Sequence, residues 1–179
     1  VTFAKGYEPG KTELDQDLIR EAVDLARSAD AVVLFVGLPA IDESEGFDRE
    51  HLDIPRQQEL LINSVCKENP NSVVVLSNGA PVTMPWVDAP RAILEGYLLG
   101  QAGGAAVADI LFGKTNPSGK LAESFALEQQ DIPSDNWFSG AGRQVQYREG
   151  LYVGYRYFDS ANKEVLFPFG HGLSYTEFE

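Results

Sequence analysis

The 179-residue sequence has few of the side chains that build metal or redox sites. It contains one cysteine, Cys66, and two histidines, His51 and His171, which lie far apart in the chain. A single cysteine cannot form an intrachain disulfide, and the two histidines lack the spacing of a metal-binding motif. We therefore expect no metal and no cofactor. Any chemistry must rest on carboxylates, hydroxyls or lysine.

Basic residues and long apolar runs are also scarce. Lysine and arginine number 14 against 27 aspartates and glutamates, so the net charge is −13. Nucleic acids and anionic membranes are bound through basic patches, so neither is expected as a partner. No apolar run approaches the roughly 18 residues of a membrane span. No signal peptide is visible, which favours a cytoplasmic location, although the missing initiator methionine suggests a piece of a longer chain.

Helix and strand patterns alternate along the first two thirds of the sequence. The predicted helices span residues 12–29, with Thr12 as N-cap, 56–68 and 105–112. The predicted strands span residues 31–36, 72–76 and 92–98. The first of them is a continuous apolar run rich in β-branched residues, as is typical of strands buried on both faces. The alternation predicts an α/β fold with a mostly parallel sheet and helices on its faces, and the length fits one domain over residues 1–179.

The last third of the sequence has a different character. A short strand is predicted over residues 121–125, and residues 127–147 are polar and rich in turn-forming residues. Residues 150–158 and 166–176 carry many aromatic side chains. These aromatics could form a platform that stacks on a sugar, but a strand and loop packed on the core is the favoured interpretation.

A cluster of carboxylates follows the first predicted strand. Residues 42–49 hold four carboxylates and one arginine, Arg49, with Gly46 and Phe47 among them. A solvated charge run would not need an apolar residue such as Phe47 or a turn-forming glycine. Ligands of open α/β sheets bind outside the carboxyl ends of the strands, so this acidic loop is the candidate site for acid–base chemistry.

Other candidate sites are less specific. The run Gly100 to Gly104 precedes a predicted helix and could bind phosphate. It matches neither the dinucleotide-binding nor the P-loop spacing, so a tight turn is favoured. No serine lies in a nucleophile elbow. His51 could tune the acidic loop, and His171 is expected to be a structural hydrogen-bonding residue.

The acidic loop resembles the S-[EG]-E-G-[YF]-D-R motif of the C-terminal catalytic domain of glycoside hydrolase family 3. Eight further segments resemble this family in the same order. They are Leu52-Asp53-Ile54-Pro55 with Gln58; Val73 to Leu76 with Asn78 to Val82; Met84-Pro85-Trp86; Gly100 to Gly104; Ala108 to Gly113; Asn116 to Leu121; Tyr152 to Tyr157; and Phe167 to Tyr175. The resemblance covers nearly the whole chain and implies a three-layer α/β/α sandwich.

The resemblance also implies a retaining glycosidase that acts on β-glucosides or oligosaccharides. Its nucleophile is an aspartate of a (β/α)8-like barrel domain of the same polypeptide, which is absent from this sequence, and its acid/base is a glutamate of the sandwich domain. Motif position assigns that role to Glu45, with Glu43 as the competitor and with Asp48 and Arg49 fixing the loop. Because both carboxyl groups are needed, residues 1–179 alone are expected to be inactive. The substrate-binding residues stay unassigned, and the alternatives are a non-catalytic sugar-binding or nucleotide-binding domain.

Overall fold

A computed structural model describes residues 1–11, 13–138, 140 and 142–177 of the protein. The chain divides into two compact units. The first comprises Val1–Ala80 with Met84–Leu98, and the second Pro81–Thr83 with Leu99–Glu179. Each unit is described by itself below, and the single domain expected over residues 1–179 stays a prediction.

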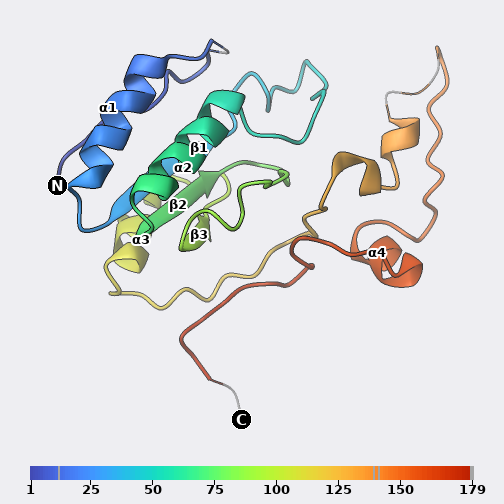
Figure 1. The fold of residues 1–179 in the computed structure, drawn as a ribbon. Helices are drawn as coiled ribbons and strands as arrows, with labels where there is room; N and C mark the ends of the chain where they lie inside the picture. Colours follow the sequence, from blue (N-terminus) through green and yellow to red (C-terminus); the bar gives the residue numbers. More distant parts are fainter. Residues whose placement is uncertain (12, 139, 141, 178–179) are drawn as a thin grey trace. The chain divides into compact units, whose positions relative to one another are not determined.

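A three-stranded parallel sheet forms the centre of the first unit (Figure 1). Its strands are β1 (Val32–Gly37), β2 (Ser72–Ser77) and β3 (Ala92–Glu95), in the order β1-β2-β3. Val32 pairs with Ser72, and Val73 pairs with Ala92. All three strands end at the same edge because they run parallel. The predicted α/β class and parallel sheet are confirmed, and the acidic loop leaves the sheet at this carboxyl edge.

Two helices of the first unit lie side by side (Figure 1). Helix α1 (Gln16–Arg27) packs on α2 (Arg56–Glu68), and α2 packs on β1 and β2. Helix α1 is shorter than predicted because the Asp15 side chain caps it, accepting hydrogen bonds from the backbone N–H groups of residues 17 and 18 at 3.0 and 3.2 Å. The predicted cap, Thr12, lies outside the described residues.

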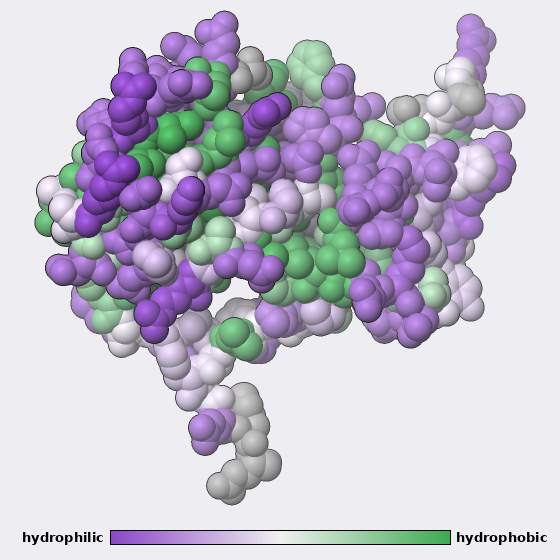
Figure 2. Space-filling model, in the orientation of Figure 1, coloured by the Kyte–Doolittle hydropathy of each residue, from purple (hydrophilic) through white to green (hydrophobic). Residues whose placement is uncertain are grey.

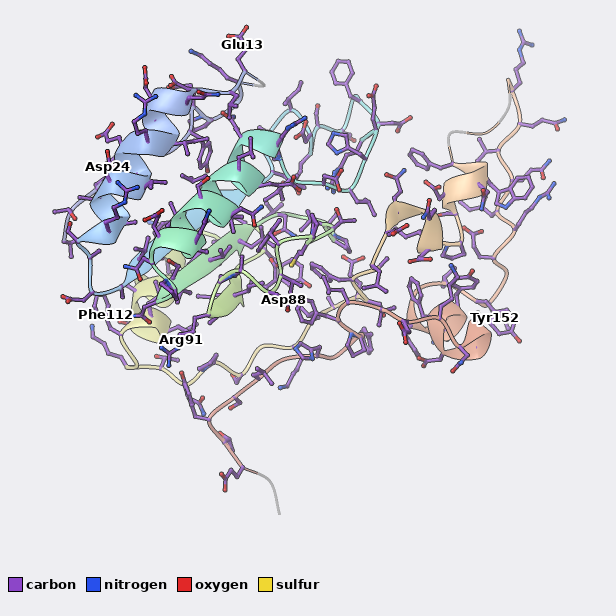
Figure 3. All side chains as sticks on the ribbon, in the orientation of Figure 1. Glu13, Asp24, Asp88, Arg91, Phe112 and Tyr152 are labelled. Carbon is purple, nitrogen blue, oxygen red and sulfur yellow. The ribbon has the colours of Figure 1, made fainter. Side chains whose placement is uncertain are left out.

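The surface of α1 is mainly hydrophilic, as Figure 2 shows. Asp24 projects from the outer side of this helix (Figure 3) and forms an ion pair with Arg27 at 2.6 Å. The Arg27 guanidinium also reaches Glu68 of α2 at 3.0 Å. Exposed pairs of this kind contribute only about 0–1 kcal/mol each. Burial of apolar side chains must therefore dominate the packing of the two helices.

Side chains of α2 and β2 form the core of the first unit. Leu61, Ile62 and Val65 of α2 are at most 4% exposed, and Val74 and Leu76 of β2 are fully buried. Complete burial of one such side chain contributes roughly 1.5–3 kcal/mol. Leu61 and Val65 lie four residues apart on one face of α2, as is typical of a helix that packs on a sheet.

Strand β1 is less buried than its sequence predicts. Val33 and Phe35 are 41% and 60% exposed, although both lie in a continuous apolar run. The exposed residues alternate with buried Leu34 and Val36, so one face of β1 is covered and the other is not. Strand β2 matches the prediction, with four of its six residues buried.

The end of β1 is held by a buried amide. Gly37 N–H donates to Gln58 Oε1 at 2.7 Å, and Gln58 Nε2 donates to the Gly37 carbonyl at 2.9 Å. The carbonyl of Ser77 accepts from Leu38 N–H at 3.0 Å. A Cβ atom on Gly37 would stand 1.9 Å from that Ser77 oxygen. This close approach of β1 and β2 therefore requires glycine at position 37.

Gly37→Ala is accordingly expected to destabilise the protein by about 1–3 kcal/mol or more, because the strands must separate at the carboxyl edge. Gly46→Ala is the matched control, since no atom lies within 4 Å of a Cβ placed there. Urea unfolding followed by circular dichroism measures both variants. Equal midpoints for the two variants would show that the strands can separate at no cost.

The described residues of the second unit form four short helical segments. They are α3 (Gly103–Leu111), η1 (Gln129–Asp131), η2 (Asp135–Trp137) and α4 (Tyr155–Ala161). The strand predicted over residues 121–125 is reduced to one antiparallel bridge between Phe125 and Phe167. Phe125 is 1% exposed and is the anchor of this region.

The aromatic segment near residue 155 forms a helix rather than the predicted strand and loop. Helix α4 follows Gly154 and buries Phe158, whereas Tyr152 is 56% exposed and points outward (Figure 3). The Tyr155 ring stacks on Phe169 with 5.0 Å between centroids. Aromatic residues favour strands by propensity. In this segment, contacts with other parts of the fold, such as the stack on Phe169, outweigh that preference.

Candidate active site

The acidic loop begins where β1 ends. Its first turn is closed by a hydrogen bond from Asp42 N–H to the Pro39 carbonyl at 2.9 Å. A second turn is closed by Phe47 N–H on the Ser44 carbonyl at 3.4 Å. The two turns fold residues 39–47 back on themselves. They present the carboxylates of the loop at the carboxyl edge of the sheet.

Glu43 and Glu45 have different surroundings. Glu43 is half-buried, and its Oε1 accepts a short hydrogen bond from the backbone N–H of Gly79, in the turn that follows β2. Glu45 is exposed, and nothing in the described part of the chain donates a hydrogen bond to its carboxylate. The loop is thus anchored to β2 through Glu43, while the carboxylate of Glu45 is open to an incoming molecule.

Arg49 lies partly buried behind the loop. Burial lowers the pKa of its guanidinium, and the carboxylates of Glu43, Asp42 and Asp53 act in the opposite direction. An arginine remains charged under all ordinary conditions, so it supplies a fixed positive charge beside Glu43. Asp48 is exposed. This arrangement supports the expected loop-fixing role for Arg49, with Glu43 rather than Asp48 as the carboxylate that acts most strongly on it.

Phe47 does not shield a carboxylate within the described chain. Its side chain is 71% exposed, so it creates no apolar pocket around Glu45 here. An exposed ring cannot exclude water from a neighbouring carboxyl group without another surface to cover it.

One further carboxylate at the same edge, Glu95, was not found from the sequence. Glu95 is the last residue of β3, and its Oε1 accepts from Tyr97 N–H at 2.8 Å. Burial raises the pKa of this carboxyl to about 7, although hydrogen bonding from Tyr97 and Asn78 acts to lower it. The predicted strand ran on to residue 98 and so passed over this position. The signal that was missed is a charged residue within an apolar run, three residues after the strand begins.

The remaining candidate residues make contacts within the fold. The glycine run forms a tight turn, in which Gly103 N–H donates to the Gly100 carbonyl at 2.9 Å, as the sequence favoured. His171 stacks on Phe167 with 5.0 Å between ring centroids. Burial raises the pKa of the Glu59 carboxyl. His51 lies close enough to Glu59 to oppose this shift, but more weakly.

The described residues contain neither a metal-binding cluster nor a membrane-spanning helix. Across residues 1–11, 13–138, 140 and 142–177, no three or more His, Cys, Asp or Glu side chains gather as they would around a metal ion. The helices within the same residues are too short or too polar to span a membrane.

Comparison with known proteins identifies the family. Residues 4–175 match the family model of the glycosyl hydrolase family 3 C-terminal domain. The thermostable β-glucosidase B of Acetivibrio thermocellus is 52% identical over 179 residues, covering 100% of this chain and 24% of that protein. An exo-α-(1→6)-L-arabinopyranosidase of Bifidobacterium breve is 49% identical over 178 residues, covering 99% of this chain and 24% of that protein.

Solved structures agree with this result. The crystal structure of the family 3 β-glucosidase of Bifidobacterium adolescentis matches with a TM-score of 0.90 and 51% identity, over 97% of this chain and 26% of that one. The β-glucosidase of Kluyveromyces marxianus in complex with glucose matches with a TM-score of 0.88 and 42% identity, over 93% and 20%. The chain belongs to the C-terminal domain family of glycosyl hydrolase family 3. It spans about a quarter of the length of the curated relatives it matches.

Proposed function

We propose that this chain supplies the general acid/base, Glu45, of a retaining β-glucosidase. The nucleophile is an aspartate in a barrel domain of the same polypeptide, outside residues 1–179. One observation carries the choice of residue. Glu43 is engaged by the Gly79 N–H, whereas Glu45, two residues further along, is exposed on the same loop.

The first half of the reaction forms a glycosyl-enzyme. The barrel carboxylate attacks the anomeric carbon of the terminal sugar while Glu45, as the acid, gives its proton to the glycosidic oxygen. The bond between anomeric carbon and oxygen breaks, and the alcohol leaves neutral. Protonation of the leaving oxygen matters most when the alcohol is a poor leaving group, because an unprotonated alkoxide is a strong base.

The second half of the reaction returns the enzyme to its starting state. Glu45, now a carboxylate, removes a proton from a water molecule that attacks the anomeric carbon, and the barrel carboxylate leaves. Retention requires the two carboxyl groups to lie about 5 Å apart. Glu45 must therefore be presented outward from this chain. Its exposure on the acidic loop supports this arrangement.

The stereochemistry of the first product tests the proposal. Proton NMR of the full-length protein acting on 4-nitrophenyl β-D-glucopyranoside should show β-glucose first, before mutarotation. Initial release of α-glucose would contradict the double displacement. The α-L-arabinopyranoside belongs in the same assay, because relatives about half identical to this chain carry both enzyme names. We expect the β-D-glucoside to react faster.

A further inference from the structure

The carboxyl edge of the sheet contains a polar pair that the proposed reaction does not use. Glu95 ends β3, and Asn78 is the first residue after β2. Asn78 is fully buried, and its Nδ2 donates to the Ala80 carbonyl at 2.8 Å. The same side chain lies close enough to Glu95 to lower the pKa of its carboxyl. A buried pair in this position holds the turn over residues 78–80 to the end of β3.

This turn is also where the acidic loop is attached. The peptide N–H that follows Asn78 belongs to Gly79, and it donates to Glu43 Oε1. A continuous series of contacts therefore runs from β3 through the turn after β2 to the acidic loop. Any movement of the turn moves the donor that holds Glu43, and Glu45 lies only two residues beyond.

We propose that Glu95 and Asn78 are positioning residues for the acid/base, which act by fixing the turn that holds Glu43. The role rests on the proposed function of Glu45. Neither residue contacts the reacting atoms in this scheme. Their effect reaches the reaction through the position of the loop, and it should therefore change kcat more than KM.

Burial, and not hydrogen bonding, favours a neutral Glu95. Glu95 Oε2 and Asn78 Oδ1 are two buried acceptors that lack a hydrogen-bond partner within the described residues. A proton on Glu95 supplies a donor to this environment, whereas a carboxylate adds a buried charge, which is costly. The pKa of about 7 is caused by burial, and the only groups that oppose it are Tyr97 N–H and the Asn78 amide, with no charged residue contributing.

The pH dependence of the full-length protein tests this role. As the pH rises through about 7, the wild type should lose kcat because Glu95 ionises, whereas Glu95→Gln should lack this loss. At pH 8, one unit above the Glu95 pKa, the Gln variant should be roughly tenfold more active than the wild type. At pH 6 the two should agree within about twofold, a range we set from the matching shape of the two side chains.

Two further variants complete the experiment. Glu21→Gln removes an exposed carboxylate from α1 and should keep the wild-type profile. Asn78→Ala should lower kcat about tenfold or more with little change in KM, because it releases the turn from Glu95. It also keeps the inference testable if the Gln variant fails to fold.

The possible outcomes separate this inference from the proposed function. If the wild type turns over substrate, two results would overturn the positioning role alone. One is the same pH profile of kcat for the wild type and Glu95→Gln. The other is a wild-type kcat for Asn78→Ala. A wild type that hydrolyses no β-glycoside would overturn the proposed function and the positioning role together.

Discussion

Full-length Glu45→Ala is expected to hydrolyse an alkyl β-glucoside about 10²–10⁴-fold more slowly than the wild type. The physical reason is the proton that Glu45 gives to the leaving oxygen. The 2,4-dinitrophenolate group departs as a stable anion and needs no such proton, so formation of the glycosyl-enzyme from its glucoside should be far less affected. Single-turnover release of the phenolate and steady-state hydrolysis of the alkyl glucoside measure the two cases.

Glu43→Ala is the matched control for this experiment. It removes a carboxylate of the same type from the same loop, but one that accepts from Gly79 N–H in this structure. Its effect should be similar for good and poor leaving groups, because loss of an anchor displaces the whole loop. A leaving-group dependence in Glu43→Ala, together with none in Glu45→Ala, would reverse the assignment.

The isolated chain of 179 residues is expected to show no β-glucosidase turnover. Retaining hydrolysis needs two carboxyl groups on opposite sides of the anomeric carbon, and one of them is proposed to lie in another domain. The relatives are about four times longer than this chain, which supports that division. The assay compares purified residues 1–179, shown by circular dichroism to be folded, with the full-length protein at equal concentration. Turnover by the isolated chain would place a complete active site within it.

The central elements of the fold could be predicted from the sequence. Helix α2 has the predicted bounds because its apolar residues keep strict helical spacing and Asn69 and Pro70 follow directly. Strand β2 was predicted almost to the residue because it is the central strand, where an apolar run and burial agree. Local pattern and tertiary environment point the same way in both elements, so the pattern was sufficient.

Other elements of the fold were predicted less accurately. Strand β3 was expected to reach residue 98, but Tyr97 takes a left-handed backbone conformation with φ of 51°, which ends the strand. Helix α4 was missed because aromatic residues of its sequence suggested a strand. The exposure of Phe35 could not be predicted, because a continuous run of apolar residues does not show that only one face of the strand is covered.

The candidate site shows the same division between local and non-local information. The acidic loop was found because its charges are consecutive in the sequence. The engagement of Glu43 by Gly79, 36 residues away, depends on the pairing of β1 with β2. The carboxyl of Glu95 joins this edge only through the pairing of β3 with β2. Its role therefore could not be predicted from the residues that surround it in the sequence.

Product analysis of Glu45→Ala in the presence of azide is the sharpest test of Glu45 as the acid/base. Azide needs no general base, so it can attack the glycosyl-enzyme that lacks Glu45, from the face that Glu45 would have served. We expect β-glucosyl azide and a partly restored rate for the full-length Glu45→Ala protein, and neither for Glu43→Ala. β-Glucosyl azide from Glu43→Ala alone, or an α-configured azide, would contradict it.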